Sequence, residues 1–216
     1  MIKNLVFDLG NVLVEFKPKD YMERLGFAEN DIINLHQIIF KDKRWNEFDR
    51  GTLTIDKYVE DLKNENPEYA GHIDNIFSEN WTSNLFRPKF ETIEFLKRAS
   101  EQYGIYVLSN VSQYVLSYVK SLGFWDNVNS GTYSYEIGSC KPEPEIYQAF
   151  FRDNNLNPQD CLFLDDLAAN IEAAKKAGMN GIVFNDNLSD IIDYLINDRK
   201  MPQKGQLQEK NDDFIR

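Results

Sequence analysis

Side chains suited to phosphate and metal chemistry stand directly after apolar runs of this chain. A short apolar run that ends at a turn is typical of a buried parallel strand. Open α/β sheets keep their ligand sites at the carboxyl ends of such strands. Side chains in these positions are therefore expected at one edge of a sheet. The residues concerned are Asp8, Ser109, Asn110, Asp165 and Asp166.

Three carboxylates brought together would repel one another and raise each other's pKa unless a cation lies between them. A set of oxygen ligands without histidine or cysteine favours a hard ion, Mg²⁺ above all. Lys141, in a loop before a proline, adds a positive charge that suits a bound phosphate. Asp8 is then placed to attack phosphorus. Each residue alone also fits an ordinary turn or helix cap, and it is their recurrence on separate strands that favours a site.

Strands that alternate with helices predict how these residues are positioned. After the first strand, apolar runs at 105–108, 161–164 and 181–184 indicate further strands. Helices are expected from Pro88 to Gly104, near 112–122, at 145–154, at 171–177 and from an N-cap at Ser189. The fold class is α/β, a doubly wound parallel Rossmann-like sheet with a small all-helical domain inserted after the first strand.

The insert has helical periodicity but no strand pattern. It spans residues 17–86 and is expected to form a second, smaller domain, while residues 1–16 and 87–198 form the α/β core. Within the insert, residues 41–54 look too polar and too broken by glycine to belong to a core. Residues 199–216 are expected to form a polar C-terminal tail.

Composition argues against several classes of partner. The net charge is −11, from 24 basic and 35 acidic residues, and there is no basic run, so nucleic acid is not expected as a partner. The sequence contains no apolar stretch of membrane-spanning length and no signal-peptide pattern, which predicts a cytoplasmic protein without a membrane partner. Cys140 and Cys161 are too few for a disulfide framework and are interpreted as small buried residues.

Four segments resemble the motifs of the haloacid dehalogenase-like (HAD) superfamily. They read FDLGNV at 7–12, LSN at 108–110, KPEPEIY at 141–147 and LDDLAANIEAA at 164–174. The resemblance extends to about residue 185 and implies the HAD core fold with a helical cap.

The resemblance also implies a role for each matching residue. Asp8 corresponds to the aspartyl nucleophile, and Ser109, with Asn110 beside it, to the phosphate-binding motif. Lys141 corresponds to the lysine of the third motif. The implied Mg²⁺ ligands are Asp8, the carbonyl of Gly10 and Asp166 directly and Asp165 through water, and Asn170 is implied to orient the Ser–Lys–Asp network.

One position departs from the pattern of most phosphatases in the superfamily. They carry a second aspartate two residues after the nucleophile, as general acid and base, and here that residue is Gly10. General acid–base catalysis typically contributes about 10²- to 10⁴-fold in rate. Three explanations are open: a leaving group that needs little help, a substitute such as Asp49 or Glu15, or a feeble catalyst. The string DLGNVLV resembles a subgroup that includes glucose-1-phosphate phosphatases, in which this glycine is the norm, and this favours the first.

The segment FDRGTLT at 48–54 resembles the substrate-facing loop of the HAD cap. Arg50 is expected to contact a sugar hydroxyl or the phosphate, and Gly51 to allow a close turn. Trp45 is a candidate for stacking on a sugar. The alternative is a solvated interhelical loop with Trp45 half in the core.

The function expected from these residues and the resemblance is a Mg²⁺-dependent phosphatase. It would act on a small phosphorylated metabolite, such as a sugar 1-phosphate, through an aspartyl-phosphate. The alternatives are a non-catalytic or feeble phosphate-binding HAD protein and a metal-independent haloacid dehalogenase. The acidic pair Asp165–Asp166 favours the phosphatase over the dehalogenase.

Overall fold

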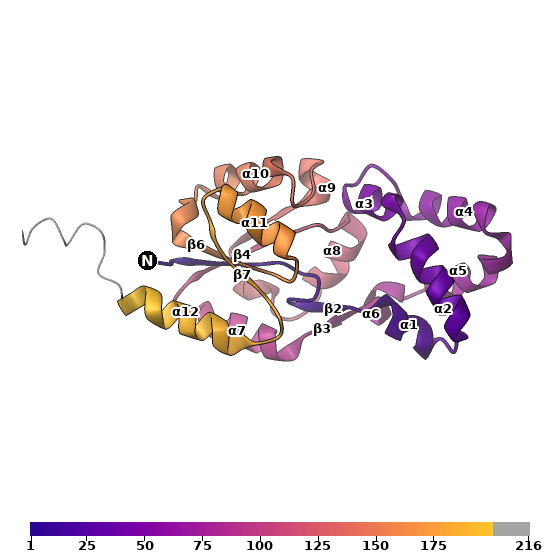
Figure 1. Cartoon of the computed structure of the whole chain (residues 1–216), viewed down its shortest axis with the longest axis horizontal. Coiled ribbons are helices and arrows are strands. Elements are labelled where there is room, and N and C mark those ends of the chain that lie inside the picture. The colour runs from indigo at the N-terminus through magenta and orange to yellow at the C-terminus, as the bar shows by residue number, and fades with distance from the viewer. Residues whose placement is uncertain (201–216) are drawn as a thin grey trace, which may run out of the picture.

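Five parallel strands form the central sheet, in the order β5-β4-β1-β6-β7. The computed structural model describes residues 1–200 (Figure 1). The sequence predicts four of the strands and misses β5, whose residues SGTY contain no apolar run. The α/β class and the parallel sheet are confirmed. The strands are β1 (Asn4–Phe7), β4 (Gly104–Ser109), β5 (Ser130–Tyr133), β6 (Cys161–Asp165) and β7 (Asn180–Val183).

Register brings the carboxyl ends of the three middle strands to one edge. Phe7, the last residue of β1, pairs with Val107 of β4 and with Leu164 of β6. Asp8 therefore leaves the sheet beside the last residues of β4 and β6. All five residues of β6 are buried, as expected for a strand covered on both faces.

Helices cover both faces of the sheet (Figure 1). Alternate residues of β1 point to opposite faces. Val6 packs with apolar side chains of α10 and α11, whereas Leu5 and Phe7 belong to the larger core that includes side chains of α7, α8 and α12. The short helix α9 follows β5. These helices are α7 (Phe90–Ala99), α8 (Gln113–Lys120), α9 (Ser134–Ile137), α10 (Pro144–Asn154), α11 (Ala168–Lys176) and α12 (Leu188–Lys200).

A group of short helices lies at one end of the molecule, away from most of the sheet (Figure 1). The chain passes into and out of this group through an antiparallel pair of strands, β2 (Val14–Phe16) and β3 (Phe86–Pro88). The elements of the group are α1 (Pro18–Arg24), α2 (Glu29–Leu35), a π-helix (His36–Phe40), α3 (Lys43–Asp49), α4 (Ile55–Glu65), a 3₁₀ turn (Pro67–Tyr69), α5 (Ala70–Ile76) and α6 (Trp81–Leu85).

The prediction that residues 41–54 contribute nothing to a core is wrong. Helix α3 forms there, capped by the side chain of Asp42, which accepts the backbone N–H of Arg44 at 2.8 Å. Trp45 and Phe48, one turn apart, are buried on the same face of α3. The many polar residues of the segment occupy its other faces, which is why composition alone was misleading.

Three predicted helix starts are also wrong. Helix α11 begins at Ala168, three residues before the predicted start. Pro88 does not open a helix, because it pairs with Val14 in β3, and α7 begins at Phe90. Helix α12 begins at Leu188, where the side chain of Asn187 accepts the backbone N–H of Ser189 at 3.1 Å. This helix extends to Lys200, two residues into the predicted tail, and residues 201–216 lie outside the described part of the chain.

Candidate functional site

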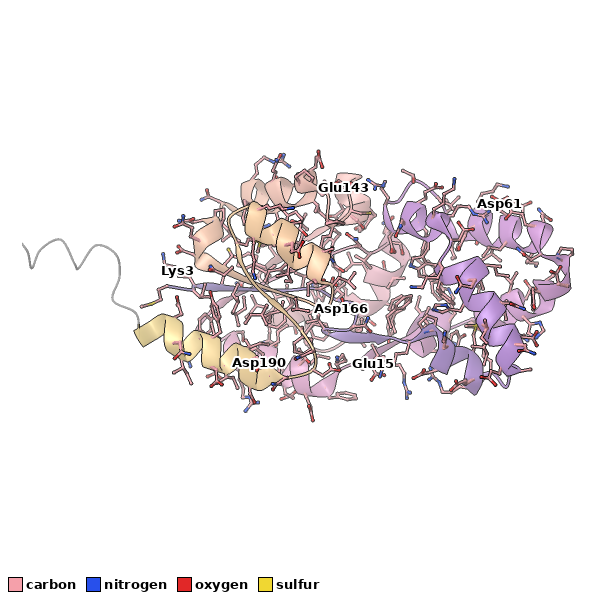
Figure 2. All side chains as sticks on the ribbon, in the orientation of Figure 1. Lys3, Glu15, Asp61, Glu143, Asp166 and Asp190 are labelled. Atoms are coloured by element: carbon pink, nitrogen blue, oxygen red, sulfur yellow. The ribbon has the colours of Figure 1, made fainter. Side chains whose placement is uncertain are left out.

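The predicted carboxylates meet at the carboxyl edge of the sheet. Asp8 follows β1, Asp165 ends β6 and Asp166 comes next. One oxygen from each of the three lies within 4.8 Å of the others. Asp8 and Asp165 are buried, and Asp166 is half-buried. Figure 2 shows Asp166 on the sheet-bearing part of the molecule, on the side that faces the helices of residues 18–85.

Lys141 bridges two of these carboxylates. Its Nζ lies 2.8 Å from Oδ1 of Asp8 and 2.7 Å from Oδ2 of Asp165, and it donates to the carbonyl oxygen of Leu108 at 3.0 Å. Burial by itself would lower the pKa of the Lys141 ammonium, but the two carboxylates outweigh it and raise the pKa. The lysine therefore stays charged inside the protein and fixes the spacing of β1 and β6 at this edge.

Asn110 holds the segment that carries Lys141. Its Nδ2 donates to the carbonyl of Lys141 at 2.9 Å, and its Oδ1 accepts the backbone N–H of the same residue at 2.7 Å. Both ends of the amide are thus used on the Lys141 backbone. The structure places Asn110 behind the lysine, while Ser109 ends β4 and is buried beside Asp8.

Asn170 lies against Asp165, as the motif pattern suggests. Its Nδ2 lies 2.9 Å from Oδ1 and 3.0 Å from Oδ2 of Asp165, and Oδ1 also accepts the backbone N–H of Leu167. With Lys141 on Oδ2, both oxygens of Asp165 are engaged. Tyr147 anchors Asn170 by donating to its carbonyl at 2.9 Å. Asp165 thus fixes the positions of Lys141, Asn170 and the backbone of Leu167.

The site has more negative than positive charge. Burial raises the pKa of Asp8 to about 6, with Asp165 adding to the rise and Lys141 opposing it. Burial likewise raises the pKa of Asp166. Three carboxylates face one ammonium, so a further cation would relieve the repulsion. Among the three, Asp8 and Asp166 are the better ligands, because Asp165 already uses both oxygens.

Asn11 completes the site and was missed by the sequence reasoning. Its Nδ2 donates to Oδ2 of Asp166 at 2.9 Å, and its Oδ1 accepts the backbone N–H of Phe16 at 3.0 Å. Its backbone is left-handed, with φ at 56°. A Gly-Asn pair directly after Asp8 signals such a turn, and asparagine is enriched in that conformation.

A cavity of about 90 Å³ opens beside the carboxylates, between the sheet edge and α3. Leu9 and Gly10 line it from the loop after β1, Ser109 and Asn110 from the end of β4, and Asp49 from α3. Most of the remaining wall is apolar and consists of Val14, Phe16, Trp45, Phe86, Val111, Val115 and Val119. Residues next to the carboxylates and residues of the group of short helices thus line one cavity.

Arg50 contacts residues on both sides of Lys141 in the chain and does not line the cavity. Its guanidinium binds both oxygens of Glu143, at 2.9 and 2.5 Å, and donates to the carbonyl of Gly138 at 2.9 Å. Glu143 also accepts from the Ser139 hydroxyl at 2.7 Å. Figure 2 shows Glu143 on the side of the sheet domain next to α3.

Of the predicted site residues Trp45 and Glu15, only Trp45 lines the cavity. Trp45 is buried, stacks on Phe16 and forms part of the cavity wall. Glu15 is partly exposed on β2 and pairs with Lys17 at 3.3 Å, and it is not among the residues that line the cavity. In Figure 2 Glu15 lies at the edge of the molecule near β2. Of the two proposed stand-ins, only Asp49 reaches the site.

Comparison with known proteins agrees with this geometry. A sequence profile of the haloacid dehalogenase-like hydrolases matches residues 2–178. The chain is 28% identical over 193 residues to a D-ribitol-5-phosphate phosphatase from Bacteroides thetaiotaomicron, covering 82% of this chain and 89% of that protein. It is 23% identical over 193 residues to a sesquiterpene phosphatase from Aspergillus oryzae, covering 88% and 94%.

A solved structure shares the fold. It is that of a HAD family enzyme from Bacteroides thetaiotaomicron in complex with magnesium and inorganic phosphate, with a TM-score of 0.71 and 22% identity. The similarity covers 88% of this chain and 99% of that one. Among residues 1–200, no helix has both the length and the apolar character needed to cross a membrane. Since the family profile spans most of its length, this chain is a hydrolase that belongs to the haloacid dehalogenase-like family.

Proposed function

We propose that the protein is a Mg²⁺-dependent phosphatase that hydrolyses a small phosphorylated metabolite through an aspartyl-phosphate on Asp8. The observation that carries the proposal is the buried Lys141, held 2.8 Å from Asp8 and 2.7 Å from Asp165. This arrangement brings together a carboxylate nucleophile, a cation that can bind phosphoryl oxygens and an acidic cluster, all at one edge of the sheet. The phosphatase names of two relatives support the reaction type.

The chain's own groups would divide the work as follows. Asp8 attacks phosphorus, the ester bond breaks, and the phosphoryl group passes to the Asp8 carboxylate. Lys141 and the Ser109 hydroxyl bind phosphoryl oxygens, while Asn110 fixes the lysine. Arg50 instead positions the Lys141 segment through Glu143. Water then releases phosphate and restores Asp8.

Asp8 and Asp166, with the Gly10 carbonyl, would hold the Mg²⁺, and Asp165 would contact it through water. The fit follows from the donor set, since the cluster offers only oxygen and carries excess negative charge. Bound there, the ion would supply charge stabilisation to the transferring phosphoryl group. The structural neighbour in complex with magnesium and inorganic phosphate supports this assignment.

Residues 17–86 would act as a cap domain over a core made of residues 1–16 and 87–198. The contribution of α3 to the cavity wall supports this division. The largely apolar wall favours a leaving group with few hydroxyls on the side that faces Trp45. A sugar 1-phosphate remains the specific substrate hypothesis from the sequence, beside the polyol phosphate named for one relative. We also propose a cytoplasmic location.

A phosphate-binding protein without turnover is the second candidate, and Gly10 is the observation that favours it. A dehalogenase is disfavoured, because Asp165 and Asp166 form an acidic pair suited to a cation that metal-independent dehalogenation does not need. Binding of phosphate without hydrolysis would identify the second candidate.

The test is phosphate release from a panel that includes glucose 1-phosphate, ribitol 5-phosphate and 4-nitrophenyl phosphate, with Mg²⁺ and with EDTA. Asp8→Asn is the variant and Glu15→Gln the matched control, because Glu15 is a carboxylate outside the cavity. We expect release that needs Mg²⁺, is lost in Asp8→Asn and is unchanged in Glu15→Gln. Phosphate binding with no release from any ester would contradict the phosphatase.

A further inference from the structure

We propose that Asp49, the last residue of α3, is the general acid and base of this enzyme and replaces the carboxylate that Gly10 lacks. The inference rests on the proposed phosphatase function and assigns it a further catalytic residue. The role concerned is proton transfer to the leaving group and from water. Residue 10 cannot perform it here, because glycine has no carboxyl group.

Asp49 and Gly10 line the same cavity from opposite elements. Asp49 comes from α3 and Gly10 from the loop after β1, with Ser109 at the end of β4 completing the polar part of the wall. A Cβ built on Gly10 meets no atom within 4 Å, so the space in front of this glycine is open. A carboxylate reaching in from α3 can therefore occupy the region that a side chain at position 10 would fill.

The position of Asp49 relative to the sheet edge is fixed by its neighbours. Its backbone carbonyl accepts the Ser134 hydroxyl at 2.6 Å, and Ser134 also binds the backbone N–H of Val111 at 2.8 Å. The next residue, Arg50, is held by Glu143. These contacts join the end of α3 to the segments after β4 and β5, which is the anchoring that a proton donor needs.

The surroundings of Asp49 favour the protonated form of its carboxyl group. Burial raises the pKa of its carboxyl well above the usual value, and the negative charge of Asp8 raises it further. A hydrogen bond from the backbone N–H of Ser112 and the charge of Lys141 oppose the rise. A carboxyl group whose pKa is raised in this way keeps its proton to a higher pH, and it is suited to give that proton to a leaving group.

The two steps balance as follows. As Asp8 attacks phosphorus and the P–O bond to the leaving group breaks, the Asp49 carboxylic acid gives its proton to the leaving oxygen, and an alcohol departs. The Asp49 carboxylate then takes a proton from water, whose oxygen attacks phosphorus. The bond between phosphorus and Asp8 breaks, phosphate leaves, and both carboxyl groups return to their starting states.

Other carboxylates are less suited to the task. Asp165 uses both oxygens on Lys141, Asn170 and the backbone of Leu167. Glu15 is outside the cavity and pairs with Lys17. Among the described residues that line the cavity, Asp49 is the one with a carboxyl group.

The experiment compares Asp49→Asn with wild type on two kinds of ester. With ribitol 5-phosphate or the best alkyl ester of the panel, we expect kcat to fall by about 10²- to 10⁴-fold, the range of general acid–base catalysis. With 4-nitrophenyl phosphate the leaving group needs no proton. The variant should then show a rapid burst of about one 4-nitrophenolate per enzyme, followed by slow turnover, because water lacks its base.

A second variant tests whether a carboxylate in this space is what matters. The double variant Gly10→Asp/Asp49→Asn should have a kcat at least tenfold higher than that of Asp49→Asn alone, because the space in front of Gly10 is open. Equal loss on both esters with no burst, and no recovery in the double variant, would make Asp49 a purely structural residue. Unchanged kcat in Asp49→Asn would overturn the proposal outright.

Two controls separate this inference from the proposed function. Asp8→Asn should give neither burst nor turnover, whereas Asp49→Asn keeps the burst. If wild type itself releases no phosphate from any ester, the phosphatase function fails. If wild type is active and Asp49→Asn equals it, only the role of Asp49 fails. The burst also reports that Asp49→Asn is folded.

Discussion

Asn110 binds the backbone of Lys141 through both ends of its side-chain amide, donating at 2.9 Å and accepting at 2.7 Å. The two residues are 31 positions apart, and this pair joins the end of β4 to the segment before α10. Lys141 in turn bridges Asp8 and Asp165. The position of the one buried cation in the cluster therefore depends on an uncharged neighbour.

Replacing this amide should affect activity more than stability. Asn110→Ala removes two hydrogen bonds, at a cost of about 1 to 3 kcal/mol in the free energy of unfolding. It should also lower kcat by about 10- to 100-fold, the size of effects from residues that orient a ligand. Kinetics and urea denaturation of the same samples would measure both.

Asn180→Ala is the matched control. Its Nδ2 donates to the carbonyls of Gln159 and Cys161 at 3.0 and 3.2 Å, and its Oδ1 accepts the Tyr194 hydroxyl at 3.1 Å. These contacts lie near the start of β6, at the other end of the strand from Asp165. We expect a similar loss of stability with kcat unchanged. Equal kcat losses in both variants would contradict a special role for Asn110.

Gly51 allows the loop after α3 to approach the sheet domain. Its φ is +78°, and an added Cβ would lie 3.1 Å from Cβ and 3.2 Å from the carbonyl oxygen of Tyr135. Gly51→Ala should cost about 1 to 2 kcal/mol for the left-handed backbone and also push the loop away from Tyr135. This movement would displace Asp49 and Arg50, and we therefore expect kcat/KM to fall.

Gly26→Ala separates these two effects. Gly26 has φ of +80° but nothing within 4 Å of an added Cβ. The Gly26 variant should lose stability and keep its kinetics. Calorimetry and initial rates on both variants test the prediction, which is wrong if the two variants have the same kcat/KM.

The ion pair between Arg50 and Glu143 should govern how firmly α3 stays at the site. Glu143→Gln removes the charge that faces the guanidinium, and we expect KM to rise severalfold while Asp8 chemistry persists. The pair is partly exposed, so the effect on stability should be below about 1 kcal/mol. Steady-state kinetics at low and high salt would measure it.

Asp74→Asn is the control for this ion pair. Asp74 lies on α5 and pairs with Lys63 at 2.5 Å, so this ion pair lies within the group of short helices. Its KM should stay at the wild-type value. A KM shift of the same size in Asp74→Asn would mean that Glu143 has no particular role.

Mg²⁺ should stabilise the protein more at neutral than at acidic pH. The pKa of Asp8 is raised from 3.8 to about 6, so the folded metal-free protein holds this proton more tightly than the unfolded chain. Its stability without metal should therefore fall as pH rises from about 4 to about 6. Because Mg²⁺ binds the carboxylate, its affinity should rise over the same interval.

Thermal unfolding with and without Mg²⁺, at about pH 5 and about pH 7.5, tests this linkage. The increase in Tm should be larger at the higher pH, and Asp8→Asn should remove most of the difference. A Tm increase that is independent of pH would contradict the link between Asp8 and the ion.

Much of the fold was decided by local sequence. The apolar runs before Asp8, Ser109 and Asp165 specify buried strands, and parallel strands must bring their carboxyl ends to one edge. The edge strand β5, with the sequence SGTY, could not be predicted in this way. It exists because β4 offers it a partner, and pairing does not show in local composition.

The site was determined in part by the sequence alone. Residue types and motif spacing named Asp8, Lys141, Asp165 and Asp166, and the structure brings them together. Spacing could not say that Asn110 turns back to the Lys141 backbone or that Arg50 faces Glu143. The first contact joins residues 31 positions apart and the second joins residues 93 positions apart. The orientation of these side chains follows from how the elements pack.

The tertiary structure also decided between Asp49 and Glu15, which the sequence left equal. Helix α3 forms because Trp45 and Phe48 bury one of its faces, and its last residue then lies at the cavity. Glu15 lies on a short strand whose neighbours Val14 and Phe16 line the cavity, so its own side chain points to the other face. Alternation along a strand and burial of a helix face are physical reasons that operate only once the elements are packed together.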